Sequence, residues 1–403
     1  MNKLTKCLAA VFLTLSMALM GIVSYYSEAL PDEFLVNGAG MPRLMCLFNI
    51  EVTPADAAVE ASTKDSDELE ADVKLFGVIP IKEAKITHTE APVLIPGGTP
   101  VGIKLLTDGV MVVRVQDVAD GICPARDANL CEGDNIISAN GEKLTSSSRL
   151  SDIIQSSNGE KIELEVQRDS RSFKTVLTPM FSEREGTYKG GLWIRDSSAG
   201  VGTLTFIDPK TGCYGALGHP ISDCDTLRTL PLGSGEIVDV TITGYERGER
   251  GCPGELFGTF VSGLASGSIV RNCDQGIFGI MTYSSRNNAI PIAFKSEVKT
   301  GPAKIITTIQ GSKPQEFDVE IEKVTLSSGA KTKNIVIRVT DTELLDSTGG
   351  IVQGMSGSPI IQDGKLVGAV THVFVSDPTR GYGIFIENML ESAEDVVQEK
   401  IAA

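Results

Sequence analysis

The sequence from residue 182 to residue 386 consists of short apolar runs separated by Gly, Pro, Asn and Asp. Examples of these runs are GVGTLTFIDP, DVTITGYERG, GIFGIMTYS and LVGAVTHVFVSD. Apolar runs of this length, divided by turn-forming residues, are typical of strands in all-β sandwiches and barrels. The apolar spacing of a helix returns only at residues 386–403, in IENMLESAEDVVQEKIAA. We therefore expect a C-terminal all-β unit that is closed by a helix.

Length and composition restrict the classes of protein to which the chain can belong. A chain of 403 residues is too long for one ordinary core, and this length favours two or three domains. Hydrophobic residues make up 41% and charged residues 22%, as in folded globular chains. The net charge of −16 argues against a nucleic-acid partner, because phosphate contacts require clustered Lys and Arg.

The N-terminus has the pattern of an export segment. Lys3 and Lys6 precede an uncharged, mostly apolar stretch over residues 7–27, and acidic residues follow it. A positive start before an apolar stretch directs the rest of the chain out of the cytoplasm. The stretch is longer than the ~7–15 residues of a cleavable signal core and approaches the ~20 needed to span a bilayer. We expect residues 1–29 to be a membrane anchor or, alternatively, a signal sequence that is cleaved after Ala29.

Changes in composition along the chain predict the domain boundaries. Residues 30–100 are expected to hold a linker and N-terminal strands, and the linker is the acidic, small-residue-rich segment 55–72. Residues 101–180 form a coherent unit of strands with a polar helix near residues 147–156. The remaining residues, 181–403, are the β-rich region.

The segment PARDANLCEGDNIISANG resembles the signature of bacterial PDZ domains. Pro124 suits the first turn of a short helix, and Gly133-Asp134 and Asn140-Gly141 suit hairpin turns. The resemblance implies an α+β PDZ domain over residues 101–180. The alternative is a plain αβ domain that has similar turns.

The resemblance also places a peptide-binding site. Val101, Gly102 and Ile103 lie where a PDZ domain has the loop whose N–H groups bind the carboxylate of a peptide C-terminus. The neighbouring strand edge then pairs with the peptide. We expect peptide C-termini or extended protein segments as partners of this unit.

A serine in the segment GGIVQGMSGSPII has the surroundings of a nucleophile. Ser356 is framed as Gly-x-Ser-Gly-x-Pro, and such a turn exposes one hydroxyl. The N–H groups of Gly354 and Ser356 then point to one spot, as in an oxyanion hole. The pattern resembles the nucleophile loop of chymotrypsin-like proteases, which have a double β-barrel. Ser358 is a rival, but Ser356 has the expected frame.

Three histidines are available as a general base. His219, in GALGHPI, lies N-terminal to Ser356, and chymotrypsin-like enzymes have this order of histidine and serine. His372 lies on the expected wall of the substrate pocket, where it either shapes substrate preference or only packs. His88 precedes the PDZ segment and is assigned no role.

The cysteines give no sign of a metal site. The chain has 8 cysteines without a Cys-x-x-Cys pair or a Cys/His ligand spacing, so we expect no metal. Cys213 and Cys224 flank His219, and in an exported protein a disulfide between them would clamp the loop. Buried free thiols are the alternative.

The residues alone do not decide which carboxylate orients the base. Asp341 follows the expected strand KNIVIRVT and precedes Ser356 by 15 residues. Asp346, Asp239 and Asp274 remain alternatives on spacing alone.

Taken together, these motifs resemble the SpoIVB (stage IV sporulation protein B) peptidase family of endospore formers. The shared features are the N-terminal anchor, the PDZ unit, GALGHPIxD, a TD-x-x-LL segment and the dense match over residues 341–390. The resemblance implies a catalytic triad of His219, Asp341 and Ser356, and it is the resemblance that selects Asp341. No cofactor is required by this chemistry.

The resemblance further implies a role in sporulation. Members of the family are exported into the space between the two forespore membranes, cleave themselves, and cleave a regulator of an intramembrane metalloprotease, which leads to sigma-K activation. The alternative function is a non-catalytic, membrane-anchored PDZ adaptor with a degenerate protease fold. A general quality-control protease is a second alternative, but such enzymes carry PDZ domains after the catalytic domain.

Overall fold

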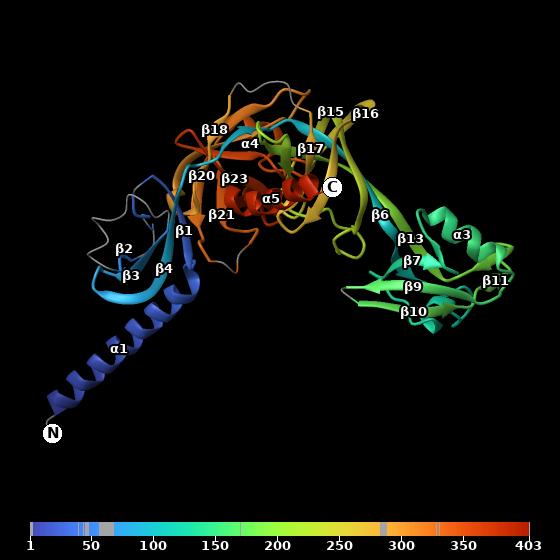
Figure 1. The fold of residues 1–403 in the computed structure, drawn as a ribbon, viewed down its shortest axis with the longest axis horizontal. Coiled ribbons are helices and arrows are strands. Elements are labelled where there is room, and N and C mark those ends of the chain that lie inside the picture. The colour runs from blue at the N-terminus through green and yellow to red at the C-terminus, as the bar shows by residue number, and fades with distance from the viewer. Residues whose placement is uncertain are drawn as a thin grey trace.

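The computed structural model describes residues 3–38, 40–42, 44, 48–55, 68–169, 171–282, 288–327, 329 and 331–402. Two β-barrels occupy the centre of the molecule, a small α+β unit lies at one end, and a long N-terminal helix projects at the other (Figure 1). The predicted fold class is confirmed: the chain is mainly β, with a PDZ unit, a double barrel and an N-terminal apolar helix.

Helix α1 (Lys3–Ala29) projects away from the rest of the chain (Figure 1). Among the described helices it is the one that is long and apolar enough to cross a membrane, over Cys7–Ala29. Large apolar side chains such as Phe12 and Met17 are exposed along it. Near its C-terminal end, Tyr26 is buried against the following sheet. This arrangement fits a membrane anchor or a signal sequence.

A small sheet with its own apolar core follows α1. Its four strands have the order β1-β4-β3-β2, with β1 parallel to β4 and the other pairs antiparallel. The strands are β1 (Glu33–Asn37), β2 (Ile50–Pro54), β3 (Glu68–Leu75) and β4 (Ile79–Thr89). The predicted linker over residues 55–72 is therefore too long at its C-terminal end. Residues 68–72 belong to β3, because Leu69 and Ala71 alternate into the core with a period of two. Residues 56–67 lie outside the described part of the chain.

The first barrel closes through six strands in the order β6-β15-β16-β17-β14-β13, and β13 pairs back with β6. The six strands are β6 (Pro100–Val115), β13 (Leu192–Ile207), β14 (Cys213–Ala216), β15 (Leu232–Glu246), β16 (Glu255–Cys273) and β17 (Gly276–Met281). Two short strands, β5 (Val93–Pro96) and β18 (Ile290–Pro291), extend the sheet beside β13. Buried Phe206, Tyr214 and Phe278 fill this part of the molecule.

The PDZ unit is inserted in the chain between β6 and β13, the first two of these six strands. Strands β6 and β13 leave the barrel side by side and run into the unit, where their outer halves continue to pair (Figure 1). The inserted elements are α2 (Pro124–Asp127), β7 (Asn135–Ala139), β8 (Glu142–Lys143), α3 (Ser147–Ser156), β9 (Ile162–Arg168), β10 (Arg171–Leu177), β11 (Met180–Ser182) and β12 (Thr187–Lys189). Its separate core includes Val110, Ile136, Leu150 and Val166.

The insertion corrects the predicted position of the peptide-binding loop. Val101, Gly102 and Ile103 do not form a loop; they lie in the barrel half of β6, between β13 and β15. Val101 and Ile103 are buried. The physical reason is that β6 is one strand of 16 residues that serves two domains. Its first half therefore has its hydrogen-bonding edges occupied by barrel strands, and the boundary predicted at residue 101 falls inside the first barrel.

The second barrel is closed, with the order β19-β20-β21-β24-β23-β22. Its strands are β19 (Gly301–Thr307), β20 (Gln315–Val324), β21 (Ile335–Val339), β22 (Pro359–Gln362), β23 (Lys365–Phe374) and β24 (Asp377–Phe385). A 3-10 helix, η2 (Lys295–Glu297), precedes it, and α4 (Thr342–Thr348) connects β21 to the segment before β22. The predicted C-terminal helix is α5 (Ile386–Ala402), which packs its apolar face, including Met389 and Val396, on both barrels.

Candidate active site

Ser356 lies in a tight turn between α4 and β22, which we call the serine turn (residues 349–358). Gly354 and Gly357 both have a φ of 96°, a left-handed conformation that favours glycine. A Cβ atom on Gly357 would lie 2.0 Å from the carbonyl oxygen of Thr203. The Gly-Met-Ser-Gly string of the sequence is therefore required by the backbone of the turn.

The serine turn is fastened to the first barrel by strand β13. The backbone N–H of Thr203 donates to the carbonyl oxygen of Ser356 at 3.0 Å, and its hydroxyl donates to the carbonyl oxygen of Gly354 at 2.8 Å. The hydroxyl of Thr205 donates to the carbonyl oxygen of Gly357 at 2.8 Å. The serine of the second barrel is thus held in register with the first barrel.

The two serines of the turn have different surroundings. The Ser356 hydroxyl donates to the carbonyl oxygen of Thr371 on β23 at 2.6 Å. Ser358 is fully buried, and its hydroxyl donates to the carbonyl oxygen of Met355 at 2.6 Å. Within the described residues, the N–H groups of Gly354 and Ser356 donate to no acceptor. The turn therefore offers one accessible hydroxyl and two unsatisfied amides.

His219 begins a second segment, which we call the histidine loop (residues 219–230), directly after β14. Leu217 and Gly218 turn the chain in the left-handed region, with φ values of 68° and 70°. Such a conformation is strained for a leucine and is found most often at functional sites. Nδ1 of His219 lies 2.8 Å from the carbonyl oxygen of Pro220. Burial lowers the pKa of His219 below its usual value.

His372 lies beside His219. The two ring centroids are 4.9 Å apart, with the planes tilted by 40°. Partial burial and, to a smaller extent, the neighbouring His219 and Lys333 together lower the pKa of His372 to about 4. His372 thus contacts His219, and as a whole the residue remains exposed to solvent.

His219 and Ser356 line one cavity of about 320 Å³ at the junction of the two barrels. Its walls are mostly apolar, and Glu255 is the one carboxylate among its lining residues. The cavity is lined by Ile103, Ser198, Gly200, Val201, Leu217, His219, Pro220, Ile221, Ser222, Glu255, Leu256, Gln353, Gly354 and Ser356. The structure therefore brings the predicted base, the predicted nucleophile and the predicted oxyanion residue Gly354 to one site.

The structure does not bring Asp341 to this site. Asp341 is the N-cap residue of α4: one carboxylate oxygen accepts from the N–H of Leu344 at 3.1 Å, and the other accepts from the N–H of Asp318 at 3.2 Å. Both oxygens are thus bonded to backbone amides, and Asp341 does not line the cavity. A cap of this kind typically stabilises a helix by ~1 kcal/mol.

The alternative acids are also outside the cavity. Asp239 on β15 accepts a hydrogen bond from the hydroxyl of Ser266 at 2.7 Å. Asp346 is exposed on α4, and Asp274 is exposed in the turn between β16 and β17. In the described part of the chain, no carboxylate is bonded to the imidazole of His219, which instead faces the Pro220 carbonyl.

Among the described residues, no disulfide joins Cys213 to Cys224. Cys213 is buried and Cys224 is exposed, so the disulfide considered across the histidine loop is not formed. Asp223, Cys224 and Asp225 have ligand atoms within 4.8 Å of one another, but Arg195 forms ion pairs with both carboxylates. A guanidinium therefore neutralises this acidic group. Cys46 lies outside the described residues.

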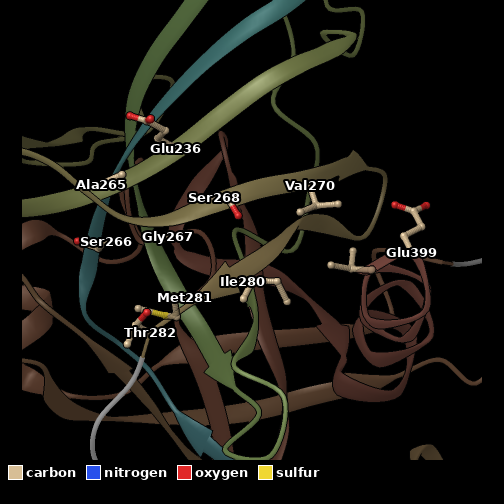
Figure 2. Close-up of a pocket in the computed structure, with 11 residues that line it drawn as sticks. Glu236, Ala265, Ser266, Gly267, Ser268, Val270, Ile280, Met281, Thr282 and Glu399 are labelled. Atoms are coloured by element: carbon tan, nitrogen blue, oxygen red, sulfur yellow. The ribbon is translucent and has the colours of Figure 1, made fainter. Parts of the chain in front are cut away.

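A larger cavity of about 700 Å³ lies elsewhere, between β16, β17 and the end of α5 (Figure 2). Small and apolar residues line most of it, with Glu236 and Glu399 on opposite sides (Figure 2). Neither His219 nor Ser356 contributes to it. No histidine is among its lining residues, so its hydroxyl groups have no imidazole beside them to act as a base.

Several residues that build the site carry no local sequence signal. Thr203 and Thr205 hold the serine turn although they are about 150 residues distant along the chain. Thr371 provides the acceptor for the serine hydroxyl. The alternation of Thr and apolar residues on β13 indicates a strand with two different faces. It does not indicate that the threonines contact the serine turn.

Two protein families match this chain, one over the PDZ unit and one over most of the region that follows it. The sequence model of the family described as SpoIVB peptidase S55 matches residues 186–390. A second family, described as PDZ domain, matches residues 117–168. A search among curated proteins found no match.

Solved structures resemble parts of the chain. The PDZ domain of the SdrC-like protein from Listeria monocytogenes is 26% identical over 22% of this chain and 87% of its own, with a TM-score of 0.20. The active form of the Rv3671c protease from M. tuberculosis is 13% identical over 49% of this chain and 74% of its own, with a TM-score of 0.29. An inactive serine-to-alanine form of that protease is 14% identical over 49% of this chain and 81% of its own, with a TM-score of 0.27.

Proposed function

Because the chain belongs to the SpoIVB peptidase S55 family, we propose that this serine peptidase is an endopeptidase with Ser356 as nucleophile and His219 as general base. One observation carries the proposal: both side chains line a single cavity where the amides of Gly354 and Ser356 have no acceptor. No other cavity among those described combines a histidine, an accessible serine hydroxyl and unsatisfied amides.

The geometry of His219 supports its role as a base. With the proton on Nδ1, the imidazole donates to the carbonyl oxygen of Pro220 at 2.8 Å. This bond leaves the lone pair of Nε2 free to accept a proton. The lowered pKa of His219 keeps the ring neutral at pH 7, as a general base requires.

The reaction begins when the Ser356 hydroxyl turns from the carbonyl oxygen of Thr371 towards Nε2 of His219. Nε2 takes the hydroxyl proton as Oγ attacks the substrate carbonyl, and the tetrahedral oxyanion accepts hydrogen bonds from the N–H groups of Gly354 and Ser356. The imidazolium then gives its proton to the departing amine, which leaves an acyl-enzyme. Water, deprotonated by His219, hydrolyses the ester and restores both side chains.

For Asp341, the resemblance and the geometry suggest different roles. The resemblance implies the third member of the triad. However, one oxygen of its carboxylate accepts from the N–H of Leu344 in the first turn of α4, and the other accepts from the N–H of Asp318 on β20. We propose that Asp341 acts by capping the helix that leads into the serine turn, and that the Pro220 carbonyl orients the imidazole in this arrangement.

A fluorophosphonate probe tests the assignment of the nucleophile. The purified full-length chain is incubated with the probe, and the modified residue is identified by mass spectrometry. Labelling should occur at Ser356 and disappear in Ser356→Ala. Ser358→Ala is the matched control, because Ser358 is buried two residues away and should leave labelling in place. Labelling that survives Ser356→Ala would refute the assignment.

We also propose a role for this peptidase in sporulation. By family resemblance the enzyme cleaves itself and a regulator of an intramembrane metalloprotease, outside the cytoplasm in the forespore intermembrane space, and so triggers sigma-K activation. The apolar helix α1 supports attachment to a membrane or export. Incubation of the chain with its candidate regulator, with Ser356→Ala as control, tests this role directly.

The PDZ unit supports binding of protein or peptide segments. In the PDZ half of β13, residues 192–195 pair with β6 on one edge, and no described strand pairs with the other edge. An extended segment can add to such an edge through backbone hydrogen bonds. We propose this edge, next to α3, as the binding site in place of residues 101–103.

The non-catalytic adaptor remains the second candidate. The observation in its favour is that the Ser356 hydroxyl is bonded to the Thr371 carbonyl and not to His219. An adaptor would bind peptides through the PDZ unit but would show no labelling of Ser356 and no cleavage of any substrate. The probe experiment therefore distinguishes the two functions.

A further inference from the structure

Strand β13 connects the PDZ unit to the serine turn. At its N-terminal end, Leu192 pairs with Val115 inside the PDZ unit. Further along, Thr203 and Thr205 donate the three hydrogen bonds that hold the serine turn. One continuous strand therefore contacts both the PDZ unit and the serine turn.

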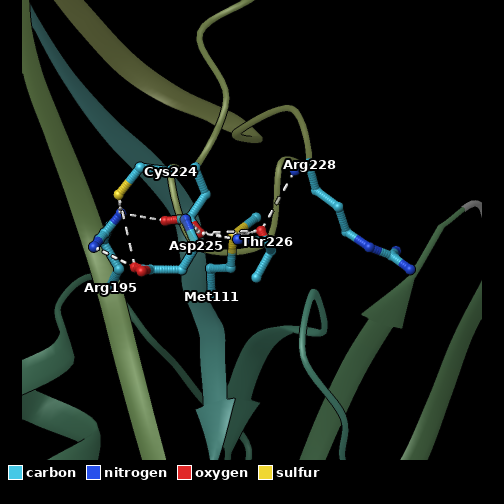
Figure 3. Close-up of polar contacts among 7 residues, drawn as sticks. Met111, Arg195, Cys224, Asp225, Thr226 and Arg228 are labelled. Atoms are coloured by element: carbon cyan, nitrogen blue, oxygen red, sulfur yellow. Dashed lines mark hydrogen bonds and ion pairs between the residues drawn. The ribbon is translucent and has the colours of Figure 1, made fainter. Parts of the chain in front are cut away.

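The same strand also holds the histidine loop, through Arg195. Its guanidinium donates to Asp223, to Asp225 at 2.9 Å, and to the thiol of Cys224 at 3.2 Å (Figure 3). The Asp223 side chain has an exposed fraction of 0%, and its other oxygen accepts from the N–H of Thr226 at 2.8 Å. A buried carboxylate is costly without a partner. The fold of the loop therefore depends on Arg195.

A second side chain closes the histidine loop near the imidazole. The carboxamide of Asn272 on β16 accepts from the N–H of Ile221 at 2.8 Å and donates to the carbonyl oxygens of Ile221 and Leu230 at 3.0 and 2.9 Å. Ile221 lies two residues after His219. Both ends of the loop are thereby fixed at one point, and the loop has little freedom to move without moving the imidazole.

The far side of the histidine loop contacts the PDZ unit. Arg228 forms an ion pair with Asp169, in the connection between β9 and β10, at 2.7 Å. Its side chain also packs on Gly133, where a Cβ atom would lie 2.3 Å from Cδ of Arg228. The hydroxyl of Thr226 lies 4.0 Å from the sulfur of Met111 on β6, next to it in Figure 3.

We propose that Arg195 is a positioning residue for His219, and that the histidine loop couples the PDZ unit to the active site. The inference rests on the proposed function only in treating His219 as the base. An occupant that shifts the PDZ half of β13 moves Arg195, and with it the loop and the imidazole. By linkage, a ligand in the active site changes the affinity of the PDZ unit in return.

The test measures the imidazole of His219 directly. The chain has 3 histidines, so a full-length sample labelled at histidine and dissolved in detergent gives few ring resonances in a pH titration. Each is assigned with a His→Gln variant. In Arg195→Gln, the loop loses the partner of its buried carboxylate and water reaches the ring, so the pKa of His219 should rise towards its usual value. Fluorophosphonate labelling of Ser356 should slow about tenfold, which corresponds to ~1.4 kcal/mol.

Two variants separate positioning from general damage. Arg195→Lys keeps a cation beside Asp223 and should restore most of the wild-type pKa and labelling rate. Arg338→Gln is the matched control, because Arg338 also contacts two carboxylates, but on β20 of the second barrel. It should change neither quantity. If Arg195→Gln does not fold, Asp225→Asn removes only the exposed partner of Arg195 and should give a smaller change of the same sign.

The outcomes distinguish this inference from the proposed function. A His219 pKa that is the same in wild type, Arg195→Gln and Arg338→Gln overturns the positioning role, whatever the labelling shows. A slower reaction without a change in pKa also overturns it, because loss of folded protein alone gives that result. A changed pKa in a chain whose Ser356 is never labelled supports the positioning of His219 while the proposed peptidase function fails.

Discussion

The serine turn and the histidine loop meet at one cavity, but different forces hold them. The serine turn is fixed by its own backbone, through two left-handed glycines and hydrogen bonds from β13 to its carbonyl groups. The histidine loop is fixed by side chains from remote strands, chiefly Arg195 and Asn272. Substitutions in the serine turn should therefore abolish its geometry through steric clashes. Substitutions around the histidine loop should instead shift its position by small amounts, through changes in charge and solvation.

This difference suggests how the activity of such a site is regulated. A turn that tolerates only one backbone conformation has no intermediate positions, so Ser356 is a poor point of control. A loop held by an ion pair and a carboxamide can move by small amounts as its partners move. The contacts of Arg228 with the PDZ unit lie on this adjustable loop and not on the serine turn.

The largest effect is expected from Gly357→Ala in the serine turn. The new Cβ atom would lie 2.0 Å from the carbonyl oxygen of Thr203, and backbone must move to relieve the contact. Labelling of Ser356 by a fluorophosphonate probe should fall below detection. Gly364→Ala is the control: Gly364 has a φ of 76° and open space around it, so only the ~1 kcal/mol cost of a left-handed alanine is expected. Equal labelling in both variants would mean that the turn is not sterically fixed.

A smaller effect is expected at Asp341, which begins the helix leading into the serine turn. Asp341→Ala removes the cap and should lower the free energy of unfolding by ~1 kcal/mol, with slower labelling of Ser356. Asp341→Ser supplies another capping oxygen but no charge, so it should restore both stability and labelling to within about threefold of wild type. Urea unfolding and the labelling rate are measured for both variants.

The serine variant at position 341 also decides between cap and catalytic acid. Loss of the orienting carboxylate of a triad typically costs ~10⁴ in turnover while the fold remains intact. A folded Asp341→Ser protein that is slowed to this extent would establish Asp341 as the acid and would contradict the capping role.

The contrast between the two regions also explains what the sequence could predict. Ser356 could be proposed as the nucleophile from its residues because the serine turn is local: its glycines and serine are adjacent in the chain. The support of His219 was not predicted, because Arg195, Asn272 and Asp223 come together only in the folded barrel. Similarly, the family resemblance could assign Asp341 to the triad but could not show that its carboxylate is bonded to the amides around α4.

The fold was predicted more completely than the domain boundaries. A β-rich region and two terminal helices follow from apolar periodicity and turn residues, whereas the double barrel and the PDZ unit were implied by resemblance to known families. The insertion of the PDZ unit into the first barrel follows from neither, because β6 and β13 each continue through two domains without a break in their strand pattern. Residues 101–103 were assigned to a peptide-binding loop because they lie where the resemblance places that loop, and nothing in the sequence marks that β6 begins in the barrel.

The smallest effect is expected from pH and tests the solvation of the histidine loop. The pKa values of His219 and His372 are lowered in the folded chain, so the unfolded chain binds more protons as the pH falls below about 6.5. The free energy of unfolding is therefore unaffected by the two histidines above that pH, and it falls as the pH drops towards 4. Because His372 is exposed, solvent screening should limit its share to less than ~1 kcal/mol. Urea unfolding at pH 7.5 and pH 5, followed by amide hydrogen exchange of β14 and β23, measures the loss in the barrels themselves. His372→Gln should reduce the loss, whereas His88→Gln, in the N-terminal sheet, should leave it unchanged. An identical loss in all three proteins would mean that the His372 ring is as well hydrated in the folded chain as in the unfolded one, and the loss would then come from other groups, His219 among them.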